Sequence, residues 1–227
     1  MLIVGGNRME LTKSKVNYYC PSIPVKFIYR LVDIVIGLIG SVLAIFLCVV
    51  IKVSYVKNHD YGSIIFTQER IGLNGKLFKM YKIRSMVPNA DQILFELMER
   101  DENIRKEYEK NKKLENDPRI TKIGHKIRKS SLDEFPQFFN VLLGNMTLIG
   151  PRPYLPREMK DMGNTYNVII QCKPAITGPW QVGGRSEIDF DNRCQIDVEY
   201  IKNKNIKQDI KIFVKTIDSV INKNGAK

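Results

Sequence analysis

The chain has 227 residues, enough for one or two domains with a real hydrophobic core, and its hydrophobic content of 44% is ordinary for a globular protein. Its formal net charge of +12 suits an anionic partner, such as nucleic acid, an acidic membrane surface or a phosphorylated substrate. The four cysteines are scattered without a CxxC pair, which argues against a zinc site, and we expect all of them to be reduced, as in a cytosolic domain.

Residues 1–25 are predicted to be a flexible lead, and an apolar block follows. Residues 34–51 carry no charged side chain, and this run is long enough for a membrane segment. No small-residue cleavage site follows it, which argues against a signal peptide. Basic residues flank both ends of the block: Lys26, Arg30, Lys52 and Lys57.

The two basic flanks bear on the topology of this segment. Positive charge tends to stay on the cytoplasmic side, so neither flank is an obvious candidate for export. We therefore predict that residues 26–55 form a re-entrant helix that dips into one leaflet and returns, with a bend permitted at Gly37, Gly40 and Ser41. A single-pass anchor is the alternative that composition leaves open. Residues 56–227 would form a cytosolic catalytic domain.

A β-hairpin is predicted next. Residues 64–67 are rich in strand formers, and Asn74-Gly75 is a typical hairpin turn. Residues 77–83 mix apolar and basic side chains, which predicts a strand with one solvated cationic face. Asn89, as an N-cap with glutamine three residues later, predicts the start of a helix that should run until the proline at 118 breaks it.

Two adjacent carboxylates, Asp133 and Glu134, stand between the apolar residues Leu132 and Phe135. Carboxylates are rarely buried unless they are paired or bound to metal, so this pattern indicates a phosphate site with a divalent cation. The structural alternative is a helix start with Ser131 as N-cap and a capping box, and both readings can hold together. The basic residues just upstream are Lys122, Lys126, Arg128 and Lys129.

Three further patterns lie in the C-terminal half. In residues 150–153 two prolines lock the backbone around Arg152, which would hold a guanidinium ready for phosphate, although a rigid turn explains the pattern equally well. Residues 176–185 form a glycine-rich loop with the only tryptophan; it could cradle phosphate, and a tight turn is the commoner meaning. The chain looks helical from Asp189, and its apolar stripe would lie on anionic lipid or pack on the domain. That stripe comprises Ile210, Phe213, Val214, Ile217 and Ile221.

Together these segments resemble the monotopic phosphoglycosyl transferase family of bacterial sugar transferases. The matching pieces, in chain order, are residues 26–52, 66–72, 82–86, 116–121, 131–137, 150–153 and 178–185. Longer members carry extra N-terminal membrane helices and a further domain, so this chain resembles the catalytic module alone. It departs from the family at Ser41-Val42, where members usually carry Ser-Pro.

The resemblance implies an enzyme of the cytoplasmic membrane with its catalytic domain on the cytosolic face. We expect a helix-rich α+β fold, with a re-entrant N-terminal membrane helix, a small β-hairpin and amphipathic interfacial helices around a compact catalytic core. Such an enzyme transfers a sugar-1-phosphate from a UDP-sugar to polyprenyl (undecaprenyl) phosphate and releases UMP, as the first step of capsule or exopolysaccharide assembly.

The resemblance also implies roles for individual residues. Asp133 would be the nucleophile that carries a covalent sugar phosphate, and Glu134 would hold Mg²⁺. Arg128, five residues before Asp133, matches the family's phosphate-binding arginine. The full set of candidate substrate-binding residues is Arg128, Arg152, Lys82, Arg84, Arg119, Gln137 and Arg185.

Two other functions compete with this one. The net charge alone would suit a membrane-tethered basic adaptor that binds anionic lipid or nucleic acid. Nucleic acid is disfavoured because the basic residues are dispersed and aromatic residues are not interleaved with them. A polyprenyl-linked transferase with a different donor is the other alternative. The sequence leaves open the sugar, the polysaccharide and the oligomeric state, a homodimer included.

Overall fold

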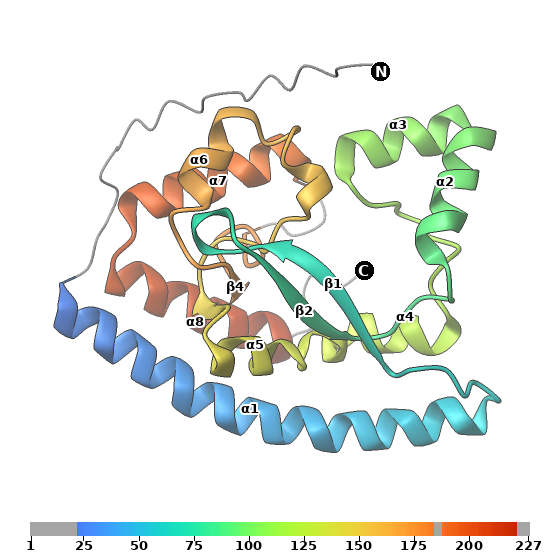
Figure 1. The fold of residues 1–227 in the computed structure, drawn as a ribbon, viewed down its shortest axis with the longest axis horizontal. Coiled ribbons are helices and arrows are strands. Elements are labelled where there is room, and N and C mark those ends of the chain that lie inside the picture. Colours follow the sequence, from blue (N-terminus) through green and yellow to red (C-terminus); the bar gives the residue numbers. More distant parts are fainter. Residues whose placement is uncertain (1–21, 184–187, 222–227) are drawn as a thin grey trace, which may run out of the picture.

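A long helix lies along one edge of a body of short helices and small strands in the computed structural model (Figure 1), which describes residues 22–183 and 188–221. The predicted flexible lead, residues 1–25, falls almost wholly outside the described residues, and Arg185 lies outside them as well. The helix-rich mixture of helices and strands that we predicted is confirmed.

The elements have the following bounds. The helices are α1 (Ile23–Lys57), α2 (Ala90–Arg100), α3 (Glu102–Asn111), α4 (Lys122–Lys129), α5 (Gln137–Leu143), α6 (Tyr166–Ile169), α7 (Phe190–Asn203) and α8 (Ile206–Ile221). Short 3₁₀ helices are η1 (Leu73–Gly75), η2 (Leu132–Glu134), η3 (Pro156–Glu158) and η4 (Gly163–Thr165). Strands β1 (Ile65–Ile71) and β2 (Leu77–Ile83) form an antiparallel hairpin, and β3 (Thr147–Ile149) and β4 (Ala175–Thr177) pair in parallel.

Helix α1 runs from Ile23 to Lys57 without a break in its helical backbone, so Gly37, Gly40 and Ser41 all lie inside the helix. The glycines allow close packing on α5. A Cβ at Gly40 would fall against the ring of Phe138, and one at Gly37 would lie 3.1 Å from the backbone nitrogen of Leu142. With valine rather than proline after Ser41, every backbone N–H of this stretch can stay in the helical ladder.

Polar side chains fasten the inner face of α1 to the body. Arg30 donates to the carbonyl oxygens of Val141 and Leu142, at the end of α5, at 2.8 Å each. Asp33 accepts from the Thr147 hydroxyl and the Leu148 N–H. The outer face of α1 carries a long run of exposed large apolar side chains, such as those of Phe27, Leu38, Val42, Phe46 and Val49. By length and composition α1 could cross a membrane.

Helix α8 adds a second exposed apolar surface. Ile212 faces the core, whereas Ile210, Phe213, Val214 and Ile217 are exposed, so these four residues do not pack on the domain. The side chain of Ile221 is not among those described. The hydroxyl of Tyr29 in α1 donates to Asp209 in α8 at 2.7 Å, which ties the two helices together.

The hairpin forms as the turn sequence predicted. Ile65 pairs with Ile83 and Ile71 with Leu77, and the connection places Asn74 (φ 56°) and Gly75 (φ 75°) in the left-handed region. The single cationic face that we predicted for β2 is wrong: Lys79 and Lys82 are three residues apart, so they lie on opposite faces of the strand.

Both predicted capping boxes are wrong. Asn89 (φ 59°) and Ser131 (φ 54°) are in the left-handed region, and neither side chain caps a helix, because an N-cap residue normally has extended backbone. The helix expected after Asn89 breaks early, since Asp101 accepts the N–H of Asn103 and starts α3. Gly144 (φ 83°), also in the left-handed region, ends α5.

Two cores hold the ends of the hairpin. Near its open end, Ile83 packs with Ile51 and Tyr55 of α1 and Ile127 of α4. Near its tip, Ile71 joins the core beneath α6 and α7. The described cysteines, Cys48, Cys172 and Cys194, are free, as predicted, and Cys20 lies outside the described residues.

Candidate active site

The two adjacent carboxylates lie on η2, which packs against β2. The Lys82 Nζ atom lies 4.0 Å from the Asp133 carboxylate and 3.8 Å from the Glu134 carboxylate, so one ammonium group serves both. Asp133 is 9% exposed, whereas the side chain of Glu134 is 44% exposed. The pair therefore offers one shielded carboxylate and one that opens to solvent.

Lys82 stands where two groups of charges meet. Burial lowers the pKa of Lys82, and the carboxylates of Glu134 and Asp133 act in the opposite direction. The positive charges of Arg70 and Arg152 lower this pKa further, so both arginines lie within electrostatic reach of the ammonium group. Lys82 thus links the carboxylate pair to an arginine-rich region.

Arg128 approaches Asp133 from α4. Its Nε donates to the Ser85 hydroxyl at 2.9 Å. Burial lowers the pKa of Arg128, and the nearby charge of Asp133 acts against that shift. Helix α4 starts at Thr121, whose hydroxyl accepts the N–H of Gly124, and a Cβ at Gly124 would collide with the carbonyl of Ser85. This close packing fixes Arg128 beside η2.

Arg152 enters from the turn that follows β3. Gly150 donates its N–H to Thr177 at 3.0 Å, and a Cβ at Gly178 would collide with the Gly150 carbonyl, so the two glycine-containing turns are pressed together. The Arg152 guanidinium consequently lies 5.4 Å from the ring centre of Trp180. The backbone N–H of Arg152 donates to Asp197 at 3.1 Å.

The sequence did not identify three further residues of the arginine-rich region. Arg193, on α7, lies 5.1 Å from the ring centre of Trp180. Asp197, one turn later, is fully buried and also accepts from the Tyr154 hydroxyl at 2.9 Å. Arg70, on β1, is buried and donates to the Pro153 carbonyl at 2.8 Å. Arg70 lies within the matching segment 66–72, but no local pattern predicted that it would meet residues far away in the chain.

The other candidates are not gathered at the site. Arg84 binds Asp60 with an N–O distance of 2.7 Å and also donates to the Ser63 carbonyl. Arg119 forms a buried pair with Asp117 at 2.6 Å and reaches a carbonyl of α2. We therefore leave these two arginines out of the site. Gln137 is buried at the start of α5.

The carboxylates of this site would suit a magnesium ion only together with ligand oxygens from the substrate. Within residues 22–183 and 188–221, no three His, Cys, Asp or Glu side chains are grouped as a metal site would need. Mg²⁺ in phosphate-handling enzymes commonly uses one or two carboxylates together with phosphate oxygens and water. Asp133 and the more exposed Glu134 meet that requirement, because both present carboxylate oxygens on one short element.

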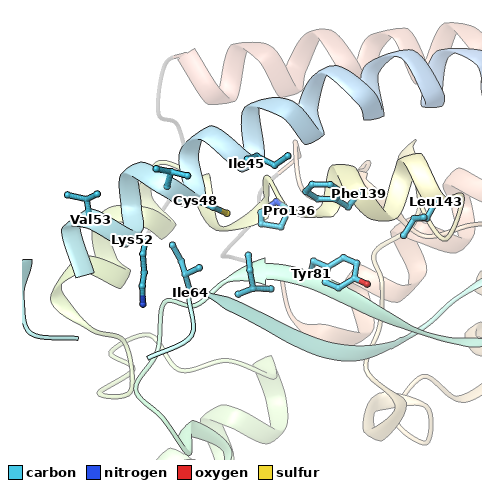
Figure 2. Close-up of a pocket in the computed structure, with 11 residues that line it drawn as sticks. Ile45, Cys48, Lys52, Val53, Ile64, Tyr81, Pro136, Phe139 and Leu143 are labelled. Carbon is cyan, nitrogen blue, oxygen red and sulfur yellow. The ribbon is translucent and has the colours of Figure 1, made fainter. Parts of the chain in front are cut away.

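An apolar cavity of about 710 Å³ lies between α1, the hairpin and α5 (Figure 2). Helix α1 supplies Ile45, Cys48, Val49, Lys52 and Val53; the hairpin side supplies Ile64, Ile65 and Tyr81; and Pro136, Phe139 and Leu143 close it. Tyr81 and Lys82 point to opposite sides of β2, so one strand separates this cavity from the carboxylate pair. Pro136 follows Glu134 by two residues, so the cavity wall and η2 are continuous.

Comparison with known proteins identifies sugar transferases. The undecaprenyl-phosphate galactose phosphotransferase of Salmonella typhimurium is 43% identical over 201 residues, which are 88% of this chain and 42% of that protein. The UDP-glucose:undecaprenyl-phosphate glucose-1-phosphate transferase of Escherichia coli is 37% identical over 170 residues, 71% of this chain and 33% of that protein. The exopolysaccharide production protein ExoY of Sinorhizobium fredii is 34% identical over 197 residues, 87% of each chain.

The chain spans between 42% and 46% of the length of four curated relatives, the Salmonella typhimurium protein among them, and 33% of the length of the Escherichia coli protein. The printed names of the relatives refer to undecaprenyl-phosphate sugar transfer and to exopolysaccharide production. The family model described as bacterial sugar transferase matches residues 25–223, which include both groups of charged side chains and most of α1. This protein therefore belongs to the bacterial sugar transferase family, as the ordered motifs of its sequence predicted.

Proposed function

We propose that the protein transfers a hexose-1-phosphate from a UDP-sugar to undecaprenyl phosphate and releases UMP, as the first step of capsule or exopolysaccharide assembly. The observation that carries this proposal is the contact of Lys82 with both Asp133 and Glu134, on the body of a protein that also exposes a long apolar helix. Soluble and lipid-linked substrates can therefore reach one molecule from two sides. The names of the relatives support both substrate classes.

In the first step, an oxygen of Asp133 attacks the phosphorus next to the sugar. A carboxylate–phosphorus bond forms, the bond between this phosphorus and the bridging oxygen breaks, and UMP leaves with the electron pair. Lys82 and Arg128 are the cations near Asp133, and they would stabilise the negative charge on the transferring phosphoryl group. No proton needs to be removed from the nucleophile, which agrees with a site built from a carboxylate and cations.

In the second step, a phosphate oxygen of the lipid acceptor attacks the same phosphorus. The bond from phosphorus to Asp133 breaks, the carboxylate is regenerated, and the product is a polyprenyl diphosphate sugar. Glu134, adjacent in sequence and more exposed, would hold Mg²⁺, which supplies positive charge to the diphosphate when bound. Both lie on η2, and adjacent side chains in a 3₁₀ helix point about 120° apart, so attack and metal binding can be divided between the two carboxylates.

We further propose that α1 stays in one leaflet with its outer face in lipid and the catalytic body on the cytosolic face. At 1.5 Å per residue, α1 is about 52 Å long, far longer than the hydrocarbon core of about 30 Å. Arg30 near one end and Tyr55 near the other both contact the body, so the whole helix lies along the domain. The exposed apolar stripe of α8 extends the same surface. A helix that lies along the membrane interface accounts for a placement in one leaflet.

The apolar cavity is our candidate for the isoprenoid chain of the acceptor. Its volume is in the range of ligand pockets, about 300–1,000 Å³, and the side chains that line it are almost all apolar (Figure 2). One wall is α1, the helix that we place in lipid, and another is Pro136, which adjoins η2. A chain in this cavity would hold its phosphate close to the carboxylates.

The test of the proposed function is nucleotide release. Purified protein, given Mg²⁺ and a panel of UDP-sugars, should release one UMP per molecule without acceptor and turn over repeatedly when undecaprenyl phosphate is added. Asp133→Asn should abolish both phases, whereas Asp191→Asn, on the exposed side of α7, should leave them unchanged. Full activity of Asp133→Asn would remove the nucleophile assignment, and no release from any UDP-sugar would remove the proposed function.

A further inference from the structure

We propose that Arg152 and Arg193, which lie against the ring of Trp180, and the nearby Arg70 bind the nucleoside monophosphate end of the donor and retain it as the leaving group. This inference rests on the proposed function and adds a site to it. The donor would bridge two regions: the sugar-side phosphorus at Asp133, and the nucleotide-side phosphate at the three arginines.

The three arginines form a concentration of positive charge. Arg152 and Arg193 lie 5.4 Å and 5.1 Å from the ring centre of Trp180, so two guanidinium groups share one aromatic ring. Burial and the charge of Arg152 both lower the pKa of Arg193, and the same two causes lower the pKa of Arg70 to about 9. Like charges that approach so closely repel each other, and a bound anion would offset that repulsion.

The nearby carboxylates of Glu158 and Asp197 already accept other hydrogen bonds. Glu158 accepts the N–H of Leu155 at 2.7 Å, and Asp197 accepts from the backbone of Arg152 and from Tyr154. In the part of the chain that the structure describes, no carboxylate lies within ion-pair distance of any of the three arginines. Their charge is therefore available for a ligand.

Unpartnered polar atoms point to the same place. Six buried side-chain polar atoms among the described residues have no hydrogen-bond partner, and three of them belong to this region: Nε of Arg70, Nε1 of Trp180 and Oδ1 of Asp197. Arg70 is 5% exposed and Trp180 is 6% exposed. Native proteins rarely leave such groups unsatisfied. Two of the three atoms are N–H donors, which match the oxygen-rich surface of a phosphate.

The position of the region favours a soluble nucleotide over a lipid phosphate. Arg70 is five residues along β1 from Ile65, which lines the apolar cavity, a separation of about 17 Å. Figure 1 shows the tip of the hairpin beside α6 and α7, while its open end lies toward α1. The packing agrees, because Ile71 belongs to the core beneath α6 and α7 and Ile83 packs on α1.

The hairpin register connects this region to the carboxylates. Phe66 pairs with Lys82 and Arg70 pairs with Phe78, so Lys82 and Arg70 project from the same face. Their Cα atoms are four strand residues apart, about 14 Å, a distance that two long side chains and a diphosphate can bridge. The charges of both Glu134 and Arg70 affect the pKa of Lys82, which places the ammonium group between the two regions.

The experiment is equilibrium binding of UMP to the full-length protein in detergent, by calorimetry at fixed ionic strength, together with KM values for UDP-sugar and undecaprenyl phosphate. Arg193→Met should weaken UMP binding at least tenfold and raise the KM for UDP-sugar, with the KM for the lipid acceptor within twofold. Arg157→Met is the matched control: Arg157 also acts on Arg70 through its charge, but it is exposed and pairs with Asp91, so UMP binding should change less than twofold.

Because Arg193 also donates to the carbonyls of Ile188 and Asn111, a thermal melt must accompany the Met variant. Trp180→Phe and Arg70→Lys are two further test variants. Trp180→Phe retains an aromatic ring and removes the Nε1 donor. Arg70→Lys retains the positive charge and removes the planar guanidinium with its several N–H donors. Both should weaken UMP binding severalfold. Inorganic phosphate should bind weakly and in competition with UMP.

The proposal is overturned if folded Arg193→Met and Trp180→Phe both bind UMP as the wild type does, or if Arg157→Met loses as much affinity. It is also overturned if the lipid acceptor, rather than UDP-sugar, is the substrate whose KM rises. Asp133→Asn separates this inference from the proposed function: it should bind UMP normally while it releases none from UDP-sugar.

Discussion

The two sides of the hairpin differ in chemistry. At its open end, α1 exposes apolar side chains and borders a cavity lined with aliphatic and aromatic groups. At its tip, Arg152 and Arg193 lie against the Trp180 ring beside the buried Asp197, and Arg70 lies within electrostatic reach of Arg152. A reaction that moves a sugar phosphate from a water-soluble carrier to an isoprenoid carrier needs one region of each kind, and Lys82 with the carboxylate pair stands between them.

This contrast also explains why a two-stranded sheet is enough to hold Lys82 in position. A two-stranded hairpin is only marginally stable by itself, so it must be held by packing against other elements. Here each end is anchored in a different core, one shared with α1 and one with α6 and α7. The strand that carries Lys82 is thereby fixed relative to both regions.

Lys82→Met should have the largest effect, because it removes an ammonium group that contacts both carboxylates. We expect kcat/KM for UMP release to fall by about 10²–10³, the usual loss when a preorganised donor to a developing charge is removed. The control is Lys79→Met on the same strand: Lys79 lies on the opposite face and is exposed, so its activity should stay within twofold. Equal losses in the two variants would contradict the division between the faces.

Gly40→Ala should have the next largest effect, and it tests how closely α1 must approach α5. The added Cβ would overlap the Phe138 ring, and overpacking of this kind typically costs about 1–3 kcal/mol. Gly37→Ala meets its neighbours at 3.1 Å or more, and the better helix propensity of alanine, about 1 kcal/mol, offsets part of that crowding. Thermal melts in detergent should rank Gly40→Ala well below Gly37→Ala. The reverse order would favour a bend or hinge at these glycines.

Local patterns in the sequence predicted several elements because their causes are local. The Asn74-Gly75 turn and the apolar stripe of α8 each depend on backbone preferences or on periodicity over a few residues. The carboxylate pair and Arg128 were also identified, since both lie within one short segment of chain.

The errors have a physical reason in common. Gly37 and Gly40 were interpreted only as places where a bend is permitted, and their close contact with α5, about a hundred residues away in the chain, was missed. Asn89 and Ser131 were read as caps from residue type alone, although their left-handed conformation depends on the surrounding packing. The grouping of Arg70, Arg193 and Asp197 with Arg152 depends on chain crossings between β1, β3 and α7, which no local pattern encodes.

Val49→Trp should weaken binding of the lipid acceptor without affecting the reaction with the UDP-sugar donor. Val49 lines the apolar cavity and Val50 does not, although both are exposed, at 61% and 50%. A tryptophan at residue 49 would fill part of the space that we assign to the isoprenoid chain, so the KM for undecaprenyl phosphate should rise about tenfold, equivalent to about 1.4 kcal/mol. The acceptor-free release of UMP should be unchanged. Val50→Trp is the control, and an equal increase there would indicate a general effect on membrane insertion.

The smallest effect concerns Asp197, beneath the arginine-rich region. Burial raises the pKa of Asp197 to about 7, from 3.8 for an exposed aspartate, while the N–H of Arg152 and the Tyr154 hydroxyl act in the opposite direction. The folded protein therefore retains a proton that the unfolded chain has already released, and stability must fall as the pH rises between these two values. Between pH 6 and pH 7 the expected loss is about 1 kcal/mol, or roughly 2–4 °C in Tm for a chain of this size.

Asp197→Asn keeps the shape of the side chain and an oxygen that can accept both hydrogen bonds, but it cannot ionise. We therefore expect its Tm to vary less with pH than that of the wild type, with the two curves diverging as the pH rises from 6 to 7.5. Asp191→Asn, exposed on the same helix, should follow the wild-type curve. If Asp197→Asn also follows it, Asp197 is ionised throughout this range. Its charge would then be held by the neighbouring arginines, and part of the positive charge assigned to the nucleotide would already be neutralised.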